Sequence, residues 1–181
     1  MHVASRRSLT TVGLLRRERL PLAQVRELVE LGAGERLLIA AQTPSGAVVT
    51  TTHALWLPRG ATLHRIGWEH VDEVTWSRDT STLVVREAAP LGARPRTWRL
   101  PMADDRDLLL VIKERVRATV ITSARVPVGG SLGVTVVARR PPGQDRLTWA
   151  VSVDPGVDVD DPAVRSAVDD AIRGLRVDLG Q

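Results

Sequence analysis

Short apolar stretches separated by turn signals fill the chain between Glu35 and Pro101, and this alternation limits the folds that are open to it. The stretches read ERLLIAAQT, AVVTTTHALWLP, TLHRIGW, HVDEVTWSR, TLVVREA and RTWRLP. Most of the turns between them carry Pro, Gly, Asp or Ser, as in PSG, RGA and DTS. Strand-length segments joined in this way are typical of neighbouring antiparallel hairpins. The six stretches therefore predict an antiparallel meander.

The apolar spacing becomes helical at Asp104, in DDRDLLLVIKERVRATV. The acidic start suits a helix N-terminus, where carboxylates accept from free N–H groups and complement the helix dipole. The residues at helical spacing predict one apolar face. This face consists of Leu108, Leu109, Ile112, Val116 and Val120.

Two further helices are predicted from start and stop signals. The first is PLAQVRELVEL, which Pro21 opens and Gly32 ends. The second closes the chain, with Asp161 as its N-cap and Pro162 in its first turn. Its apolar stripe consists of Val164, Ala167, Val168, Ala171, Ile172 and Leu175.

Three more strands are predicted between the two long helices: ARVPV, GVTVVARR and LTWAVSV. We therefore expect an α+β chain in three parts. These are a flexible basic arm over residues 1–19, a strand-rich unit with its helix over residues 20–120, and a β-β-β-α module over residues 121–181. The pattern leaves open whether the last two parts share one core.

Aromatic residues are unusual in this chain, because Phe and Tyr are absent and Trp must supply the large core side chains. The run from residue 53 to residue 76 holds three Trp and three His: Trp56, Trp68, Trp76, His53, His64 and His70. Alternation along a strand places Trp68 and Trp76 in line with aliphatic residues, which indicates packing within a sheet. The three His lack the paired spacing of a metal site, so we interpret them as strand-end or surface residues.

The net charge of +4 is spread unevenly along the chain. Residues 1–19 carry five Arg against one Glu, residues 20–150 carry 17 basic against 13 acidic side chains, and residues 151–181 carry three Arg against seven Asp. The pI near 11 reflects the scarcity of groups that titrate between His and Arg rather than a large charge excess. No apolar stretch approaches the ~20 residues needed to span a bilayer, and SLTTVGLL is too short for a signal sequence. We therefore expect a cytoplasmic protein without a transmembrane segment.

Motifs for catalysis, metals and cofactors are weak or missing. The chain has no cysteine, which excludes disulfides and thiolate chemistry, and no phosphate-binding loop or dinucleotide fingerprint. GGSLG matches the pattern around a hydrolase nucleophile, Ser131, but a β-branched strand follows it where a helix is needed, and every His precedes it. A hairpin turn is the better interpretation. The acidic cluster DPGVDVDDP, with Asp154, Asp158, Asp160 and Asp161, fits a strand exit and a helix cap better than a Ca²⁺ loop.

The meander and its helix, from Gly34 to about Val120, resemble the pleckstrin-homology-like (PH-like) fold, a β-barrel or sandwich capped by one helix. Four sequence segments also resemble those of a group of uncharacterised actinobacterial proteins with such a domain. They are GERLLIAAQT, WEHVDEVTW, RVPVGGSLGVTVVARRPP and LTWAVSVDPGVDVDDPAVR. In lipid-binding PH domains, basic residues that flank the first hairpin loop hold the inositol phosphate. The corresponding loop here, QTPSGAV, contains no Lys or Arg, which argues against phosphoinositide recognition.

Two Arg-rich segments with Trp are the candidate partner surface, because Arg can bind phosphate while Trp offers a stacking face. Their residues are Arg94, Arg96, Trp98 and Arg99 in RPRTWRL, and Arg139, Arg140 and Arg146 in RRPPGQDRLTW, which ends at Trp149. We expect a binding or scaffold protein without enzymatic activity or cofactor, which recognises a protein or peptide on a PH-like surface. The alternative is an Arg-mediated binder of nucleic acid or an anionic membrane surface, and a hydrolase using Ser131 comes third.

Overall fold

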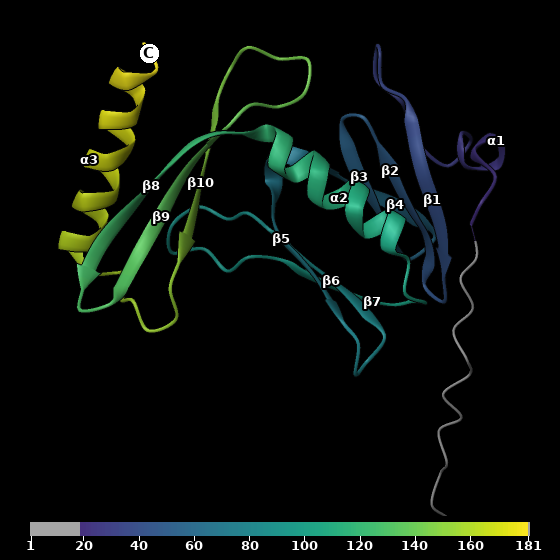
Figure 1. Cartoon of the computed structure of the whole chain (residues 1–181), viewed down its shortest axis with the longest axis horizontal. Helices are drawn as coiled ribbons and strands as arrows, with labels where there is room; N and C mark the ends of the chain where they lie inside the picture. Colours follow the sequence, from purple (N-terminus) through teal and green to yellow (C-terminus); the bar gives the residue numbers. More distant parts are fainter. Residues whose placement is uncertain (1–18, 181) are drawn as a thin grey trace, which may run out of the picture.

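Seven strands of the chain form two antiparallel sheets, and three later strands form a third sheet (Figure 1). The computed structural model describes residues 19–180. The first lobe contains α1 (Leu22–Val25), β1 (Leu37–Thr43), β2 (Gly46–Thr51), β3 (Ala54–Arg59), β4 (Thr62–Gly67), the 3-10 turn η1 (Trp68–His70), β5 (Val71–Ser77), β6 (Thr82–Glu87), β7 (Thr97–Pro101) and α2 (Arg106–Thr119). The second lobe contains β8 (Val120–Gly129), β9 (Leu132–Arg139), β10 (Thr148–Val153) and α3 (Pro162–Asp178). The predicted α+β class is confirmed.

The first lobe pairs a sheet of order β1-β2-β3-β4 with a sheet of order β5-β6-β7, and α2 packs on both. The two sheets and the helix enclose the main core. Its buried members are Ala41, Val48, Leu55, Leu57, Ile66, Trp68, Val71, Leu83, Val85, Leu100, Met102, Leu108 and Ile112. Within residues 19–180 the strands do not close into a barrel. The interpretation of Trp68 as a core residue is confirmed, since its side chain is fully buried.

The predicted strand AVVTTTHALWLP is wrong, because it is two strands, β2 and β3, joined by a turn at Thr52 and His53. Neither Gly nor Pro marks this turn. The hydroxyl of Thr51 accepts from the backbone N–H groups of His53 (3.2 Å) and Ala54 (2.8 Å), and thereby takes the place of a backbone acceptor. The meander therefore has seven strands rather than six.

The outer face of the four-stranded sheet is covered by the segment that contains α1. Val25 and Val29 pack there with Ala40, Val49 and Trp56 in a second cluster. The predicted helix PLAQVRELVEL is α-helical only over Leu22–Val25 and continues as turns. Pro21 provides no side-chain cap for this short helix, so tertiary packing rather than helix propensity holds the segment.

Helix α2 begins at a side-chain cap and ends before Val120. The carboxylate of Asp105 accepts from the Leu108 N–H (3.1 Å), as an N-cap does, and also binds Arg19 at 2.6 Å. At the other end, Thr119 is the last helical residue. The predicted place of Val120 on the helix face is wrong, because Val120 starts β8 and is 38% exposed.

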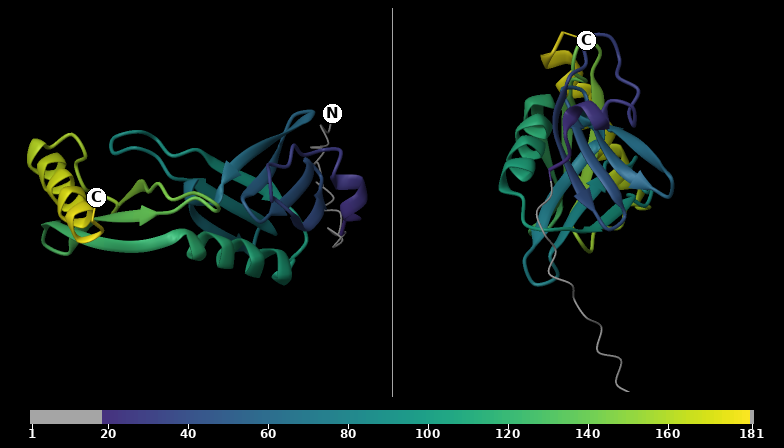
Figure 2. Two further views of the ribbon diagram at one scale, coloured as in Figure 1. Left: turned by 90° about the horizontal axis from the view of Figure 1, so that it is seen from above. Right: turned by 90° about the vertical axis from the view of Figure 1, so that its right-hand side faces the viewer.

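The second lobe has its own core, which lies between the sheet β10-β9-β8 and α3. Val134 and Val136 of β9 face Val164 and Val168 of α3. The predicted N-cap Asp161 accepts from the Ala163 N–H (2.8 Å), which confirms the start of this helix. Residues of the two lobes thus form separate clusters, and Figure 2 shows α2 running directly into β8 between them.

The lobes are also joined by contacts besides the α2–β8 connection. Leu91, from the loop between β6 and β7, packs against the core of the second lobe. Arg139 of β9 is buried and donates to the hydroxyl of Thr119, the last residue of α2, at 3.2 Å. No helix within residues 19–180 has the length and apolar composition needed to cross a membrane. The predicted flexible arm lies almost wholly outside the described residues, apart from Arg19.

Candidate functional site

A groove of about 370 Å³ lies between β5 and α2 on the surface of the first lobe. It is lined by Thr75, Trp76 and Arg78 from the β5 side and by Asp104, Arg106, Leu109 and Lys113 from the α2 side. Trp76 and Leu109 also pack against the main core and form the apolar floor of the groove. The groove volume falls in the range of natural ligand sites, roughly 300–1,000 Å³.

The pairing of β6 with β7 determines which way the backbone groups of β6 point. Thr82 lies opposite Pro101. The N–H of Met102 donates to the carbonyl of Ser81 (3.0 Å), so the hydrogen bonds flank the Thr82–Pro101 pair instead of joining it. The N–H and C=O of Thr82 therefore point away from β7 and toward β5.

It follows that β5 presents free backbone groups on the side away from β6. Ser77 pairs with Thr82 and Thr75 pairs with Val84 in register, so Ser77 and Thr75 use their backbone groups on β6. The N–H and C=O groups of Val74 and Trp76 alternate with these and point outward, where no residue within 19–180 bonds them. An open strand edge of this kind can accept one further strand.

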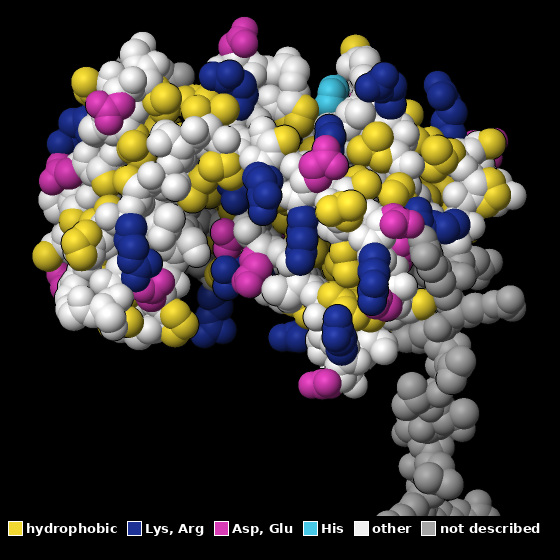
Figure 3. Space-filling model, viewed as in Figure 1, with side chains coloured by type: hydrophobic (Ala, Val, Ile, Leu, Met, Phe, Trp, Pro, Cys, Tyr) yellow, Lys and Arg dark blue, Asp and Glu magenta, His cyan; other side chains and the backbone are white. Residues whose placement is uncertain are grey.

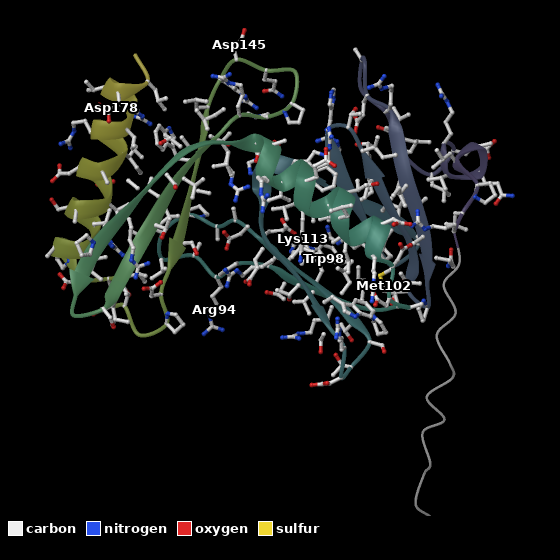
Figure 4. The ribbon with its side chains drawn as sticks, in the orientation of Figure 1. Arg94, Trp98, Met102, Lys113, Asp145 and Asp178 are labelled. Carbon is white, nitrogen blue, oxygen red and sulfur yellow. The ribbon has the colours of Figure 1, made fainter. Side chains whose placement is uncertain are left out.

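Basic side chains dominate the rim of the groove. Arg78, Arg106 and Lys113 carry positive charge, while Asp104 is the one acidic lining residue and approaches Arg106 at 4.0 Å. Arg117 lies on the same face of α2 as Arg106 and Lys113, because helical spacing returns to one side. Lys and Arg side chains gather over α2 in Figure 3, and Figure 4 labels Lys113 among them. The rim therefore favours a negatively charged occupant.

The predicted residues of RPRTWRL lie in the loop before β7 and in β7 itself. Arg94, Arg96 and Arg99 are exposed. The ring of Trp98 stacks on His64, with centroids 5.2 Å apart, and its indole N–H donates to Glu87 at 2.6 Å. The guanidinium of Arg96 also lies 5.8 Å from the Trp98 ring centre. Internal contacts therefore occupy the side chain that was predicted to offer a stacking face.

The predicted residues around the β9–β10 loop differ in exposure. Arg139 is only 4% exposed and donates to the Thr119 hydroxyl (3.2 Å), so it does not lie on a surface. Its burial lowers the pKa of the guanidinium, against the opposing effect of Asp72 and Glu69. Arg140 and Arg146 are exposed, and Arg146 donates to Gln144 (2.7 Å).

The two Arg-rich segments do not form one continuous surface. Figure 4 places Arg94 at the lower edge of the molecule and Asp145, which shares the β9–β10 loop with Arg146, at the upper edge. Trp149 packs against the core of the second lobe, and the guanidinium of Arg176 lies 5.6 Å from its ring centre. The structure therefore splits the predicted surface into separate patches.

The acidic cluster makes contacts that stabilise the fold. No group of three or more His, Asp or Glu within residues 19–180 is arranged to hold a metal ion. At the start of α3, the Asp160 carboxylate accepts from Arg165, and the Asp161 carboxylate accepts from the Ala163 N–H. Asp154 accepts from Arg125, which lowers the pKa of the Asp154 carboxyl, and the Gly133 N–H adds to this effect.

Ser131 lies in the tight turn between β8 and β9, as predicted. The backbone of Gly130 has a φ of 55°, a conformation that glycine adopts easily. The carbonyl of Ser131 accepts from Arg125 at 3.1 Å, which ties the turn to β8. These contacts account for the GGSLG motif as a hairpin turn.

The sequence did not reveal the groove between β5 and α2. Trp76 was interpreted only as a core residue, and Lys113 only as part of a helix. The basic residues at helical spacing on the outer face of α2 indicated a positively charged helix face. The spacing of residues along the sequence does not show which strand edge lies beside a helix.

The chain matches no protein-family model, and comparisons with curated proteins and with solved structures found no match.

Proposed function

We propose that this chain is a non-enzymatic binding protein whose first lobe is a PH-like module that recognises an extended, acidic segment of a partner protein. The segment lies in the groove between β5 and α2 and pairs with the outer edge of β5. The observation that carries this proposal is the open edge at Val74 and Trp76, together with the groove that Trp76 lines and that has a basic rim. Addition of a strand to a sheet edge is a recurrent mode of peptide recognition.

The element order supports the PH-like assignment. Four strands and then three strands form the two sheets, and one amphipathic helix follows and packs on both. The β1–β2 loop, which contains Pro44 and Ser45, has no basic residue. This composition favours a protein ligand over a phosphoinositide head group.

Strand pairing alone provides only part of the binding free energy that a stable complex needs. Val74 and Trp76 offer two N–H and two C=O groups, and a hydrogen bond contributes about 1 kcal/mol net. Four such bonds supply about 4 kcal/mol, which corresponds to a Kd of about 1 mM. Contacts to the apolar floor at Trp76 and Leu109, and to Arg78 and Lys113, must therefore provide most of the affinity and the preference for acidic residues.

A selection of random displayed peptides on the immobilised full chain tests the proposal. We expect the enriched peptides to carry Asp or Glu at alternate positions, because alternate side chains of an added strand share one face. Methylation of the peptide backbone at the nitrogens that pair with β5 should weaken binding at least ~10-fold, since it removes the donors and leaves the side chains unchanged.

Charge-reversal variants show whether the peptides bind in the groove. Arg78→Glu combined with Lys113→Glu should weaken binding at least ~10-fold, because it replaces attraction by repulsion. The control is Arg26→Glu combined with Arg59→Glu, which changes the net charge equally at exposed positions outside the groove. Equal losses in both double variants, or enriched peptides without acidic residues, would overturn the proposal.

Binding assays with DNA and lipid vesicles test the alternative function, which is Arg-mediated binding of nucleic acid or an anionic membrane. Binding of labelled single-stranded DNA, duplex DNA and anionic vesicles should be weak near physiological salt, because a few phosphate contacts lose affinity steeply as salt rises. Submicromolar binding that survives physiological salt and is lost in Arg96→Ala with Arg99→Ala would replace the peptide proposal by the nucleic-acid alternative. Loss only on deletion of residues 1–19 would favour a membrane or a nonspecific polyanion.

A further inference from the structure

We infer that the edge of β10 that faces away from β9 is a second strand-addition site, which takes an extended, mainly apolar segment of a partner protein. β10 is an edge strand of the second-lobe sheet. A cavity of about 310 Å³ lies between Val151, Ser152 and Val153 of β10 and residues 89–95 of the loop that joins β6 to β7. This site is separate from the groove beside β5, and the inference does not depend on the proposed recognition of an acidic segment there.

The pairing of β10 with β9 shows which backbone groups of β10 are free. The N–H of Asp154 donates to the carbonyl of Gly133 (3.1 Å), which continues the register of the two strands. Because hydrogen-bonded positions alternate along an antiparallel pair, Ser152 bonds to β9, and Val151 and Val153 point their N–H and C=O groups away from it. No residue within 19–180 bonds these outward groups.

The opposite edge of the same sheet is protected against strand addition, whereas the edge of β10 is not. Gly133 uses its backbone groups on β10, so its partner on β8, Pro127, points outward. Proline has no N–H to offer to an added strand, and natural proteins place it at sheet edges for this reason. The outward positions of β10 are Trp149, Val151 and Val153, whose residue types favour strands. β10 therefore retains an edge that can pair.

The loop beside β10 is ordered but does not pair with the strand. The N–H of Ala93 donates to the carbonyl of Pro90 (3.0 Å), and Gly92 has a φ of 82°, as in a type II turn. Leu91 packs against the core of the second lobe, and Figure 1 shows the loop between β6 and β7 reaching that lobe. Among the described residues, no backbone hydrogen bond joins this loop to β10. The cavity between them is therefore formed before a partner binds.

Half of the side chains of an added strand would meet an apolar wall. Val151 and Val153 point to the α3 side of the sheet, where they and Leu91 pack against the second-lobe core. All three side chains are half-buried and line the cavity, so a bound segment can touch them. A residue that pairs with Val151 or Val153 points to the same face of the sheet. We therefore expect apolar residues at alternate positions of the segment.

The charged side chains of the cavity indicate one further feature of the segment. Asp72 and Arg86 line the cavity and form an ion pair with each other at 2.9 Å. The third charged lining residue, Arg94, is exposed and has no ion pair within residues 19–180. The charge that remains is positive, so we expect one acidic residue in the segment, beside Arg94.

Random displayed peptides, selected on the immobilised full chain, are the probe. The chain used is the Arg78→Glu, Lys113→Glu double variant, which lacks the basic rim of the groove beside β5. Amide hydrogen exchange then locates the enriched peptides on the same variant. We expect slower exchange at Val151 and Val153 and unchanged exchange at Ser152, because only the outward N–H groups gain a partner.

Two changes test how an enriched peptide binds. Methylation of its backbone at the nitrogens that pair with β10 should weaken binding at least ~10-fold, because it removes the donors of the added strand. Arg94→Gln should weaken binding by ~3-fold, as expected for the loss of one exposed charge contact. Arg96→Gln is the matched control and should have no effect, because Arg96 is exposed in the same loop but does not line the cavity.

Three outcomes would overturn the inference. The first is unchanged exchange at Val151 and Val153 with every enriched peptide, and the second is equal affinity of the methylated and unmethylated peptides. The third is an equal loss of affinity in the two arginine variants, which would show nonspecific attraction to positive charge. Slower exchange at Val74 and Trp76 alone would be a case of the first outcome that leaves the proposed function standing, so the two failures are distinguishable.

Discussion

The imidazole of His64 stacks on the indole of Trp98, with ring centroids 5.2 Å apart and 25° between the ring planes. His64 belongs to β4 and Trp98 to β7, so the contact joins the edge strands of the two sheets in the first lobe. Glu87 strengthens the link, because its carboxylate accepts from the Trp98 indole N–H and lies 3.7 Å from His64 Nε2. Trp98 therefore has a structural role in holding the sheets together.

The first prediction follows from this contact. Trp98→Ala removes the stacked ring and leaves the Glu87 carboxylate without its indole donor, so it should destabilise the protein by about 1–3 kcal/mol. Arg99→Ala is the control, because the neighbouring Arg99 is exposed and should change stability by less than about 0.5 kcal/mol. Urea unfolding of both variants measures the effect. Equal stability of the two would mean that the stack contributes nothing.

The second prediction concerns the packing of α2. Ile112 is fully buried in the main core, and Ile112→Ala should cost about 2–5 kcal/mol because it removes buried methylene groups and leaves a cavity. Leu110 lies on the same helix but is 66% exposed, so Leu110→Ala should leave the free energy of unfolding nearly unchanged. Chemical denaturation provides the comparison. A large effect in Leu110→Ala with none in Ile112→Ala would reverse the assignment of the two helix faces.

The third prediction separates the backbone of the β8–β9 turn from its serine. Gly130→Ala should destabilise the protein by about 1–2 kcal/mol, because the positive φ of Gly130 is unfavourable for a residue with a Cβ. Ser131→Ala should have little effect, because the backbone carbonyl of Ser131 makes the contact to Arg125. Thermal melting tests both variants. Labelling of Ser131 by a fluorophosphonate probe would show instead that its hydroxyl is an activated nucleophile.

The fourth prediction is a pH dependence of the Arg125–Asp154 pair. The hydrogen bond from Arg125 lowers the pKa of Asp154 below the ordinary value of 3.8, so the charged form of Asp154 favours the folded state. This stabilisation is complete above pH 3.8 and is lost as the pH falls through the lower pKa of the folded protein. The difference in melting temperature between wild type and Asp154→Asn should therefore shrink on acidification. A constant difference down to the lowest pH at which the protein folds would show that the ion pair does not cause it.

The sequence predicted those elements whose signals are local. The acidic start of α2, the Asp161 cap, most of the two long apolar stripes and the Gly-rich turn before β9 all depend on residues a few positions apart. The turn at Thr52 was missed because the hydroxyl of Thr51, rather than Gly or Pro, stabilises it. The end of α2 was missed because Val120 continues the apolar spacing of the helix although it belongs to β8.

The candidate site was harder to predict, because it depends on contacts between distant segments. The exposure of Arg94, Arg96 and Arg99 agrees with their place in a surface segment. The sequence could not show that His64 stacks on Trp98 or that Arg139 is buried against Thr119, since these partners come from other elements. The groove beside β5 likewise depends on which strand edge α2 approaches.

Backbone amide hydrogen exchange of β5 tests the central proposal most directly. In the free protein, the outward N–H groups of Val74 and Trp76 should exchange faster than the N–H groups of Thr75 and Ser77, which bond to β6. Addition of an acidic peptide obtained by the selection described above should slow the exchange of Val74 and Trp76 and leave Thr75 and Ser77 unchanged. Unchanged exchange at Val74 and Trp76 in the saturated complex would contradict strand addition at β5.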